Sequence, residues 1–415
     1  MKKNILFFIT LLFSLSMFSS SLCACFTVNE GFIFTVDTKK ASKKHNNTLE
    51  FTIQTSPYAL PWDHYNYHID CNNDGIYEEV NQTKAYTCKY KNAGVYSIRI
   101  GGSYPAFLFK DASKYLTGSV KNPPEYKDSS KLISIDHWGT QKWSTMEYGF
   151  ANCSNLVGMA NDLPNLSQVY TMQSLFSGAT QFNAPLNDWN MSTVTNISTM
   201  FEKASSFNQV LNAWDVSSVT DMSGLFREAK LFNRPLNLWD VRKVKTMFGL
   251  FAYAETFNQD INDWNTSAVT KMGALFRDAT EFNQPLNRWD VSSVTDMFIM
   301  FHSATHFNQA LNHWDISSVT NMRAMFKNTK MFNQSLGEWK LFPSQDMIDF
   351  IEGSNISSKN YSSTLKGWAT NSHVLPKNVS FKVDAFYTKE TQEYRDILTS
   401  APNHWTIQDK GIEIK

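Results

Sequence analysis

The sequence predicts an α/β solenoid preceded by a small all-β sandwich. One motif of 25 residues, Phe-Asn-Gln-x-Leu-Asn-x-Trp-Asp-Val-Ser-Ser-Val-Thr-x-Met-x-x-Leu/Met-Phe-x-x-Ala-x-x, recurs between Phe182 and Trp339 without a change in spacing. A fixed period of this length indicates units that bury their apolar residues against their neighbours. Upstream, apolar and polar residues alternate in short segments separated by Asn, Asp and Gly, which is typical of antiparallel strands.

The bulk composition limits the partners. A chain of 415 residues is expected to hold two or three structural units. Its 38 basic and 38 acidic residues give a net charge of zero, so we expect no nucleic-acid partner. The aromatic content of 14% and the charged content of 18% are typical of an extracellular repeat or β-rich protein rather than a disordered one. Nothing in the sequence predicts a cofactor.

Residues 1–24 are expected to be a signal peptide. Lys2 and Lys3 precede an apolar segment at 5–18. That segment is shorter than the roughly 20 apolar residues that span a bilayer, so it does not predict a membrane anchor. We therefore expect the mature chain to be exported.

The end of this segment suggests a lipid attachment site at Cys25. Leu22-Cys23-Ala24-Cys25 resembles the lipobox of bacterial lipoproteins, whose last cysteine becomes the lipidated N-terminus. The resemblance implies a cell-surface or outer-membrane lipoprotein that contacts the membrane through its N-terminal lipid only. The alternative is cleavage near Ala24 and secretion. In either case residues 25–48 are expected to form a tether.

Residues 49–112 are expected to form the sandwich. Apolar and polar side chains alternate at 50–54, 65–69 and 95–100, as they do in strands with one buried face. An oxidising compartment favours a disulfide between Cys71 and Cys88. Cys153 is then expected to be a small buried residue.

The loop between two of these strands offers a metal hypothesis. Asp70, Asn72, Asp74 and Gly75 match the opening of a calcium-binding loop. The twelfth position of such a loop should be Glu, but it is Asn81, and strands rather than helices flank the segment. We favour a hairpin turn and predict no metal site, while calcium binding stays an open alternative.

Two features of the stretch 67–100 are distinctive: the segment 70–75, and Tyr90 followed by Ala93-Gly94-Val95-Tyr96. On these residues it resembles polycystic-kidney-disease-type immunoglobulin-like domains. The resemblance implies an immunoglobulin-like β-sandwich before the repeats.

The remaining boundaries follow from changes of pattern. Residues 113–131 are expected to be a connector, and the solenoid of 25-residue repeats is expected at 132–352. Residues 353–415 are expected to cap the last repeat with a helix at 358–369 and strands at 381–383 and 405–407.

One repeat predicts one short strand and one short helix. Met297, Met300 and Phe301 have the i, i+3, i+4 spacing of one helical face, which predicts a helix at 293–303. Ser293 and Thr295 are the candidate caps for its first turn. Residues 287–291 are expected to be extended. One strand and one helix in 25 residues predict leucine-rich-repeat-like units.

The repeat motif also resembles a known family. Phe-Asn-Gln-x-Leu-x-x-Trp-Asp-Val-Ser-Ser-Val-Thr-x-Met-x-x-x-Phe is similar to the repeat of the BspA-like leucine-rich-repeat surface proteins of bacteria, over about residues 132–351. The resemblance implies cell-surface display and binding to host proteins, matrix proteins or other cells. It adds no catalytic residue.

The constant columns of the repeat are expected to be core. The Phe, Trp and Met columns should be buried, and the Asn of Phe-Asn-Gln should bond turn backbone groups. An exposed Trp ladder that stacks on a glycan is the alternative. The recurring aspartates are expected to bond locally, because a catalytic carboxylate pair should occur once rather than in every repeat.

The variable positions are the better candidates for partner binding, because freedom to vary within one chain implies exposure. We expect the residues just before each Trp to lie on the strand face. The candidates among them are Asp188, Asp263, Arg288, His313 and Glu338. A second variable column follows the helix Phe.

The sequence therefore predicts a non-catalytic cell-surface scaffold or adhesin that binds a protein partner. The first alternative is a carbohydrate-binding surface module. The second is an envelope hydrolase, which we disfavour because the chain contains no Gly-x-Ser-x-Gly, His-Glu-x-x-His or glycine-rich phosphate loop.

Overall fold

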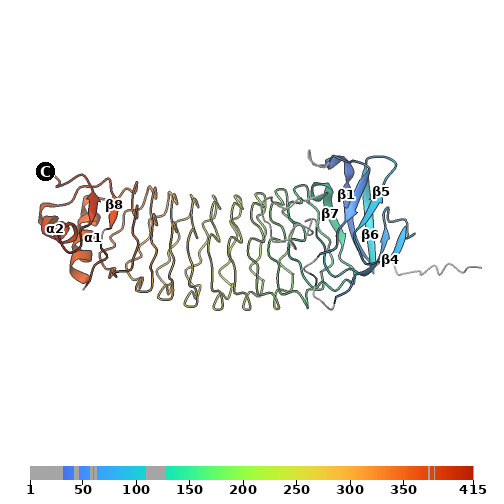
Figure 1. The fold of residues 1–415 in the computed structure, drawn as a ribbon, viewed down its shortest axis with the longest axis horizontal. Coiled ribbons are helices and arrows are strands. Elements are labelled where there is room, and N and C mark those ends of the chain that lie inside the picture. The colour runs from blue at the N-terminus through green and yellow to red at the C-terminus, as the bar shows by residue number, and fades with distance from the viewer. Residues whose placement is uncertain are drawn as a thin grey trace, which may run out of the picture.

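The computed structural model describes residues 31–41, 46–56, 59, 63–108, 128–372, 374–377 and 379–414. The molecule is elongated, with a β-sheet unit at one end, a column of stacked coils in the middle, and a unit with two helices at the C-terminal end (Figure 1). The predicted signal peptide 1–24, Cys25 and most of the connector lie outside the described residues. No helix within the described ranges is long and apolar enough to cross a membrane.

The β unit comprises the described residues between 32 and 108, together with 132–137. A five-stranded antiparallel sheet has the strand order β4-β3-β6-β1-β7, and β2 pairs antiparallel with β5. The strands are β1 (Phe32–Asp37), β2 (Glu50–Ile53), β3 (Asn66–Asp70), β4 (Glu79–Gln82), β5 (Tyr86–Lys89), β6 (Val95–Ser103) and β7 (Leu132–His137). Short 3-10 helices lie at η1 (Thr38–Lys40) and η3 (Ser129–Lys131).

Two strands of the larger sheet come from outside the predicted sandwich at 49–112. β1 lies in the segment that was expected to be tether, and β7 lies where the repeats were expected to begin. β1 is central because it pairs with β6 on one side and β7 on the other. Its alternating side chains Phe32, Phe34 and Val36 are fully buried. The prediction of a tether is therefore wrong for residues 32–37, since burial of these three side chains stabilises the sheet.

The predicted α/β leucine-rich-repeat-like solenoid is also wrong. Among the described residues the only α-helices are α1 (Ser358–Asn371) and α2 (Gln392–Thr399), and both follow the last repeat. The repeats contain neither a helix nor a strand. They form the coil stack (residues 138–357), in which each coil is a series of tight turns joined to its neighbours by isolated parallel bridges such as Lys271 to Asp296.

The hydrogen bonds of the segment predicted as a helix explain the correction. Met297 and Ile299 donate their N–H groups to carbonyls of the next coil, at 2.8 and 3.0 Å. Met300, the next residue, instead donates within its own coil, to the carbonyl of Met297 three residues earlier, at 3.2 Å. Half of the N–H groups therefore point along the stack, whereas in an α-helix every N–H after the first turn bonds within the helix.

This turn pattern requires left-handed residues at regular places. Ile299 has φ 47° and Ser303 has φ 58°, and equivalent positions in the other coils are also left-handed. Gly224 and Gly249 occupy the same position as Ile299 in earlier coils, with φ 60° and 63°. Glycine adopts this conformation without the steric cost that other residues meet.

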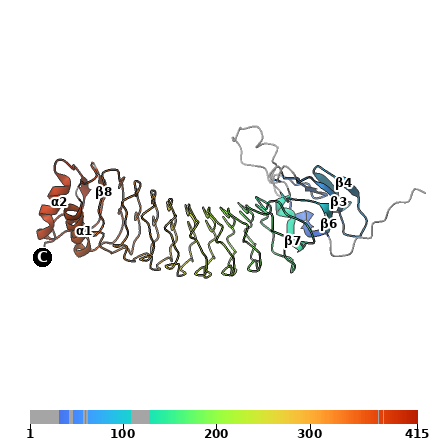
Figure 2. The ribbon, with the colours of Figure 1, turned by 90° about the horizontal axis from the view of Figure 1, so that it is seen from below.

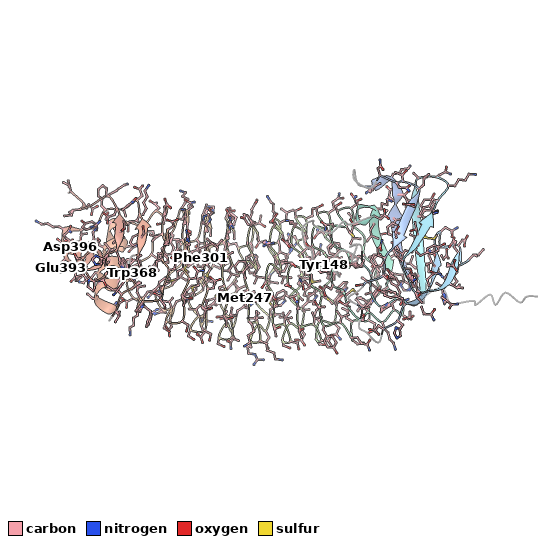
Figure 3. All side chains as sticks on the ribbon, in the orientation of Figure 1. Tyr148, Met247, Phe301, Trp368, Glu393 and Asp396 are labelled. Carbon is pink, nitrogen blue, oxygen red and sulfur yellow. A yellow bond between two sulfur atoms is a disulfide. The ribbon has the colours of Figure 1, made fainter. Side chains whose placement is uncertain are left out.

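Buried aromatic columns fill the interior of the coil stack. The ring of Phe282 stacks on that of Phe307 at 6.0 Å, and Trp264 stacks on Trp289 at 6.4 Å. Figure 3 shows side chains filling the column from end to end. The Phe, Trp and Met columns of the seven strict repeats are at most 5% exposed, so the prediction that they form a core is confirmed.

The C-terminal unit (residues 358–414) packs on the last coil. It contains α1, β8 (Ser380–Lys382), η4 (Lys389–Thr391), α2 and β9 (Thr406–Gln408), with β8 and β9 parallel. Trp368 of α1 donates from Nε1 to the carbonyl of Leu336 at 3.0 Å, as the repeat tryptophans do between coils. The view in Figure 2 shows this unit closing the end of the stack opposite the β unit.

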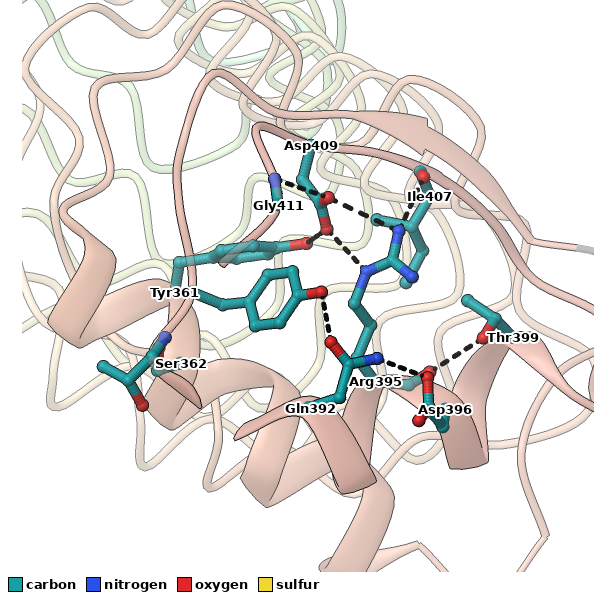
Figure 4. A network of polar contacts seen from close by, with 11 residues as sticks. Tyr361, Ser362, Gln392, Arg395, Asp396, Thr399, Ile407, Asp409 and Gly411 are labelled. Atoms are coloured by element: carbon teal, nitrogen blue, oxygen red, sulfur yellow. Dashed lines mark hydrogen bonds and ion pairs between the residues drawn. The ribbon is translucent and has the colours of Figure 1, made fainter. Parts of the chain in front are cut away.

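One polar network holds the C-terminal unit together (Figure 4). Asp409 accepts from the hydroxyl of Tyr361 at 2.9 Å and from Nε of Arg395 at 2.8 Å. Tyr387 donates to Gln392 at 2.6 Å beside it. Buried polar groups that find such partners fix the relative positions of the elements that carry them.

Candidate binding edge

The candidate partner-binding residues lie on a turn rather than on a strand face. In each coil the Trp N–H donates to the carbonyl three residues earlier, as in Trp289 to Leu286 at 3.2 Å. The residue before Trp is therefore a corner of the turn. All seven residues at this position are exposed: Asp188, Ala213, Leu238, Asp263, Arg288, His313 and Glu338.

A second exposed column runs beside the first. It lies three residues earlier in each coil and is exposed or half-exposed: Pro185, Val210, Pro235, Asp260, Pro285, Ala310 and Ser335. We name these two columns together the binding edge. The expected strand face was wrong because the coils close through turns at this place.

Asparagines of the preceding coil hold the backbone of the binding edge. Asn262 accepts from the N–H of Arg288 at 3.1 Å, and Asn212 accepts from the N–H of Leu238 at 3.1 Å. Asn262 also donates from Nδ2 to Asn287 at 3.0 Å, which links one asparagine of the column to the next. The backbone positions of Leu238 and Arg288 are therefore fixed by the neighbouring coil, and Asn187 holds the N–H of Ala213 in the same way at 3.1 Å.

The tryptophan under each turn is not available to a ligand. Trp289 is 3% exposed, and its Nε1 donates to the carbonyl of Ile261 at 3.0 Å. The same indole bond recurs with the same spacing in Trp214, Trp239, Trp264, Trp314 and Trp339. Stacking of indole faces on indole faces leaves none for a sugar ring.

The chemistry of the binding edge changes along the stack. After Asp188, which is nearest the β unit, it becomes apolar, with Val210 45% exposed and Leu238 71% exposed beside Ala213 and Pro235. Toward the C-terminal unit it is charged. There Arg288 forms an ion pair with Asp263 of the preceding coil, and His313 and Glu338 follow.

The recurring aspartates serve the turns. Oδ1 of Asp290 accepts from the backbone N–H of Ser292 at 3.0 Å and from its hydroxyl at 2.7 Å. The Ser292 side chain, followed by its N–H, lowers the pKa of Asp290 below its ordinary value. This local bonding repeats in Asp215, Asp240 and Asp315, and it does not form a general acid and base facing one substrate.

The second variable column is less exposed than expected. Ala252 is buried, the other members are half-buried, and several of them pair across coils. Glu202 forms an ion pair with Arg227, and Lys327 pairs with Glu352 at 2.6 Å. These contacts join neighbouring coils, so this column is a weaker candidate for partner binding.

In the loop where calcium binding was an open alternative, the carboxylate of Asp70 already accepts backbone hydrogen bonds. Asp70 is fully buried and accepts from the N–H groups of Asp74 at 3.1 Å and Gly75 at 2.8 Å. No group of three or more metal-ligating side chains occurs among the described residues.

The described cysteines are placed as the sequence predicted. Cys71 and Cys88 form a disulfide with a Cα–Cα distance of 5.7 Å. Cys153 is buried, and burial raises the pKa of its thiol well above the ordinary value.

Sequence reasoning missed two parts of the edge. It singled out the Asn of Phe-Asn-Gln but not the second constant Asn, such as Asn262, that holds the turn. It also kept only charged residues as candidates and passed over Leu238. The available signal was a large apolar residue at a variable position between two constant core residues.

A family model described as "Mycoplasma protein of unknown function, DUF285" matches residues 125–218, 144–264, 207–303 and 250–368. The four overlapping matches span the coil stack, which is more than half of the chain. The description assigns no activity. No curated protein and no solved structure matches the chain.

Proposed function

This chain belongs to the family described as Mycoplasma protein of unknown function, DUF285, and because that description assigns no activity we propose a function from the geometry of the coil stack. We propose a non-catalytic scaffold at the cell surface that binds a partner protein through the binding edge. The partner would be a host, matrix or neighbouring-cell protein.

The observation that carries the proposal is the exposure of Leu238 on a rigid turn. Leu238 is 71% exposed, so a partner that covers it removes apolar surface from water and makes the free energy of binding more favourable. Val210 and Pro235 extend the apolar surface, and charged residues such as Arg288 continue it along the stack. An apolar centre with a polar rim is the composition of protein–protein interfaces.

Rigidity supports the same function. Asn212 fixes the backbone N–H of Leu238, and Trp239 below it is buried. A surface that is already ordered loses little conformational entropy on binding. The stack supplies this order through contacts between coils, which leaves the exposed residues free to vary with the partner.

Surface display is part of the proposal. It rests on the signal-like residues 1–24 and on the resemblance of the segment ending at Cys25 to a lipobox. The lipid at Cys25 would hold the chain on the membrane, with the β unit nearest to it and the stack extending away. Cleavage near Ala24 would instead release the same scaffold.

The test compares one edge variant with one matched control. The chain without residues 1–24 is immobilised, host-membrane and matrix extracts are passed over it, and retained proteins are identified and remeasured as purified partners. Leu238→Glu is expected to weaken binding by at least about tenfold, because it places a charge in the apolar centre. Leu231→Glu changes a leucine that is 54% exposed but lies outside the binding edge, so it should leave binding unchanged.

Two results would contradict the proposal. Equal weakening by both variants would mean that the edge is not the contact. Retention of no protein, together with binding of glycans by the same preparation, would favour the carbohydrate-binding alternative.

A further inference from the structure

The β unit contains a cleft that is separate from the binding edge. Its volume is about 610 Å³, and it opens between the β3–β4 connection and the end of β5. The connection contributes Asn72 and Glu78, and the β5 region contributes Tyr86 and Tyr90. Tyr96 of β6 completes an aromatic wall.

The aromatic wall is fixed in place. The rings of Tyr90 and Tyr96 stack with their centroids 3.7 Å apart and their planes 12° apart. Tyr90 donates its hydroxyl to the carbonyl of Cys71 at 3.1 Å, and Tyr96 donates to the carbonyl of Asn92 at 2.6 Å. Both hydroxyls are used by the protein, so the two rings are held in fixed positions beside the cleft.

The two walls of the cleft are tied to each other. The Cys71–Cys88 disulfide joins the end of β3 to β5. Glu78 accepts from the N–H of Cys71 at 2.7 Å, which fixes the β3–β4 connection against the same point. The cleft is therefore formed before any ligand arrives, and such preorganisation favours binding.

The rim of the cleft carries positive charge. Lys89 and Lys91 line it and are exposed, and neither forms an ion pair within the part of the chain that the structure describes. Glu78 is the one acidic residue among the lining side chains. Two lysines against one glutamate leave an excess of one positive charge for a ligand to neutralise.

We propose that this cleft binds an acidic saccharide. The C–H face of a pyranose ring packs on aromatic rings, as apolar surface does, and the rings here are held rigidly. The hydroxyls of the sugar can bond to the amide of Asn72, beside its bond to Asp74, and to the carboxylate of Glu78, beside its bond to Cys71. A carboxylate on the sugar would lie between Lys89 and Lys91.

The test uses matched sugars and the chain without residues 1–24. Sialyllactose and a hyaluronan tetrasaccharide are the acidic probes, and lactose is the neutral one. Binding is measured by calorimetry and by saturation transfer in NMR. We expect at least one acidic probe to bind, with lactose at least about tenfold weaker. Lys89→Gln together with Lys91→Gln should weaken the acidic probe at least about tenfold, and so should Tyr86→Ala.

The matched control is Lys330→Gln together with Lys340→Gln, which removes two exposed lysines of the coil stack and should change nothing. Thermal unfolding of each variant verifies that the β unit is intact. Binding of neither acidic probe would overturn the site. Equal binding of lactose, or full binding by the Lys89 and Lys91 double variant, would overturn the acidic specificity. None of these results depends on the protein partner of the binding edge.

Discussion

The backbone N–H of Asn308 donates to Oδ1 of Asn283, one coil earlier, at 2.9 Å. The side chain of Gln309 donates to the same oxygen at 2.9 Å. The bond repeats from Asn183 onward and ends where Asn333 accepts from the N–H of Ser357, the residue before α1. A single column of amides therefore runs from Asn183 to the end of the coil stack and connects it to the C-terminal unit.

Replacing Asn283 should destabilise the stack through the loss of this acceptor. Asn283→Ala leaves the N–H of Asn308 unsatisfied in a half-buried place, so we expect a loss of about 1–3 kcal/mol in the free energy of unfolding. Asn283→Asp keeps an acceptor oxygen at the same position and should lose less. Urea unfolding followed by circular dichroism measures both. Equal losses would mean that the missing acceptor oxygen is not the cause of the lower free energy of unfolding.

The indole bonds between coils give a second prediction. Trp289→Phe removes the bond to Ile261, whereas Trp138→Phe removes an indole N–H that is buried without a partner in the described structure. Both variants lose the same side-chain volume. We expect Trp289→Phe to cost about 1 kcal/mol more than Trp138→Phe in urea unfolding. A larger loss at Trp138 would count against the indole bond as a stabilising contact.

The left-handed positions give a third prediction. An added Cβ at Gly249 would meet only the Cβ of Ala252, at 3.8 Å, so a larger residue fits there and the cost is one of backbone conformation. Gly249→Val should lower the free energy of unfolding by about 1–2 kcal/mol. Arg323→Val, at an exposed position that is not left-handed, should change it by less than about 0.5 kcal/mol. Similar changes in the free energy of unfolding of both variants would mean that the left-handed backbone at Gly249 is not the cause.

The buried tyrosines predict loss of stability at alkaline pH. Burial, and next the charge of Asp409, raise the pKa of Tyr361 above its ordinary value of 10.0. Because the folded state holds this proton more tightly than the unfolded state, the contribution is complete below about pH 10 and decreases as pH rises further. Tyr361→Phe should flatten this decrease between about pH 10 and about pH 12, at the cost of the bond to Asp409. Tyr170→Phe, at an exposed tyrosine, should leave the pH profile unchanged.

The difference between prediction and structure in the repeats has a physical cause. Met297, Met300 and Phe301 are buried together, as the spacing requires. That spacing is shared by a helix of 3.6 residues per turn and by consecutive turns with left-handed residues four apart, such as Ile299 and Ser303. Periodicity therefore identified the buried side chains and gave the wrong backbone.

In the β unit, the sequence pattern failed to predict the central strand β1. Phe32, Phe34 and Val36 alternate in the sequence, but a short alternating segment next to a polar stretch did not identify a central strand. Its partners β6 and β7 lie far along the chain, and such pairing depends on contacts that local pattern does not contain. The cleft at Tyr90 and Tyr96 was missed for the same reason, since the β3–β4 connection and the end of β5 come together there only in the folded unit.

The sequence by itself determined the 25-residue period, the columns that are buried, and the position before each Trp as a place where residues vary. It could do so because burial constrains residue type directly, and one chain displays seven examples of each position. The tertiary structure alone decided that the coils are made of turns, that β1 belongs to the first sheet, and that Leu238 lies exposed on a fixed corner. These features depend on which partner each N–H group finds, and in this stack half of those partners in the turn segment lie one coil away.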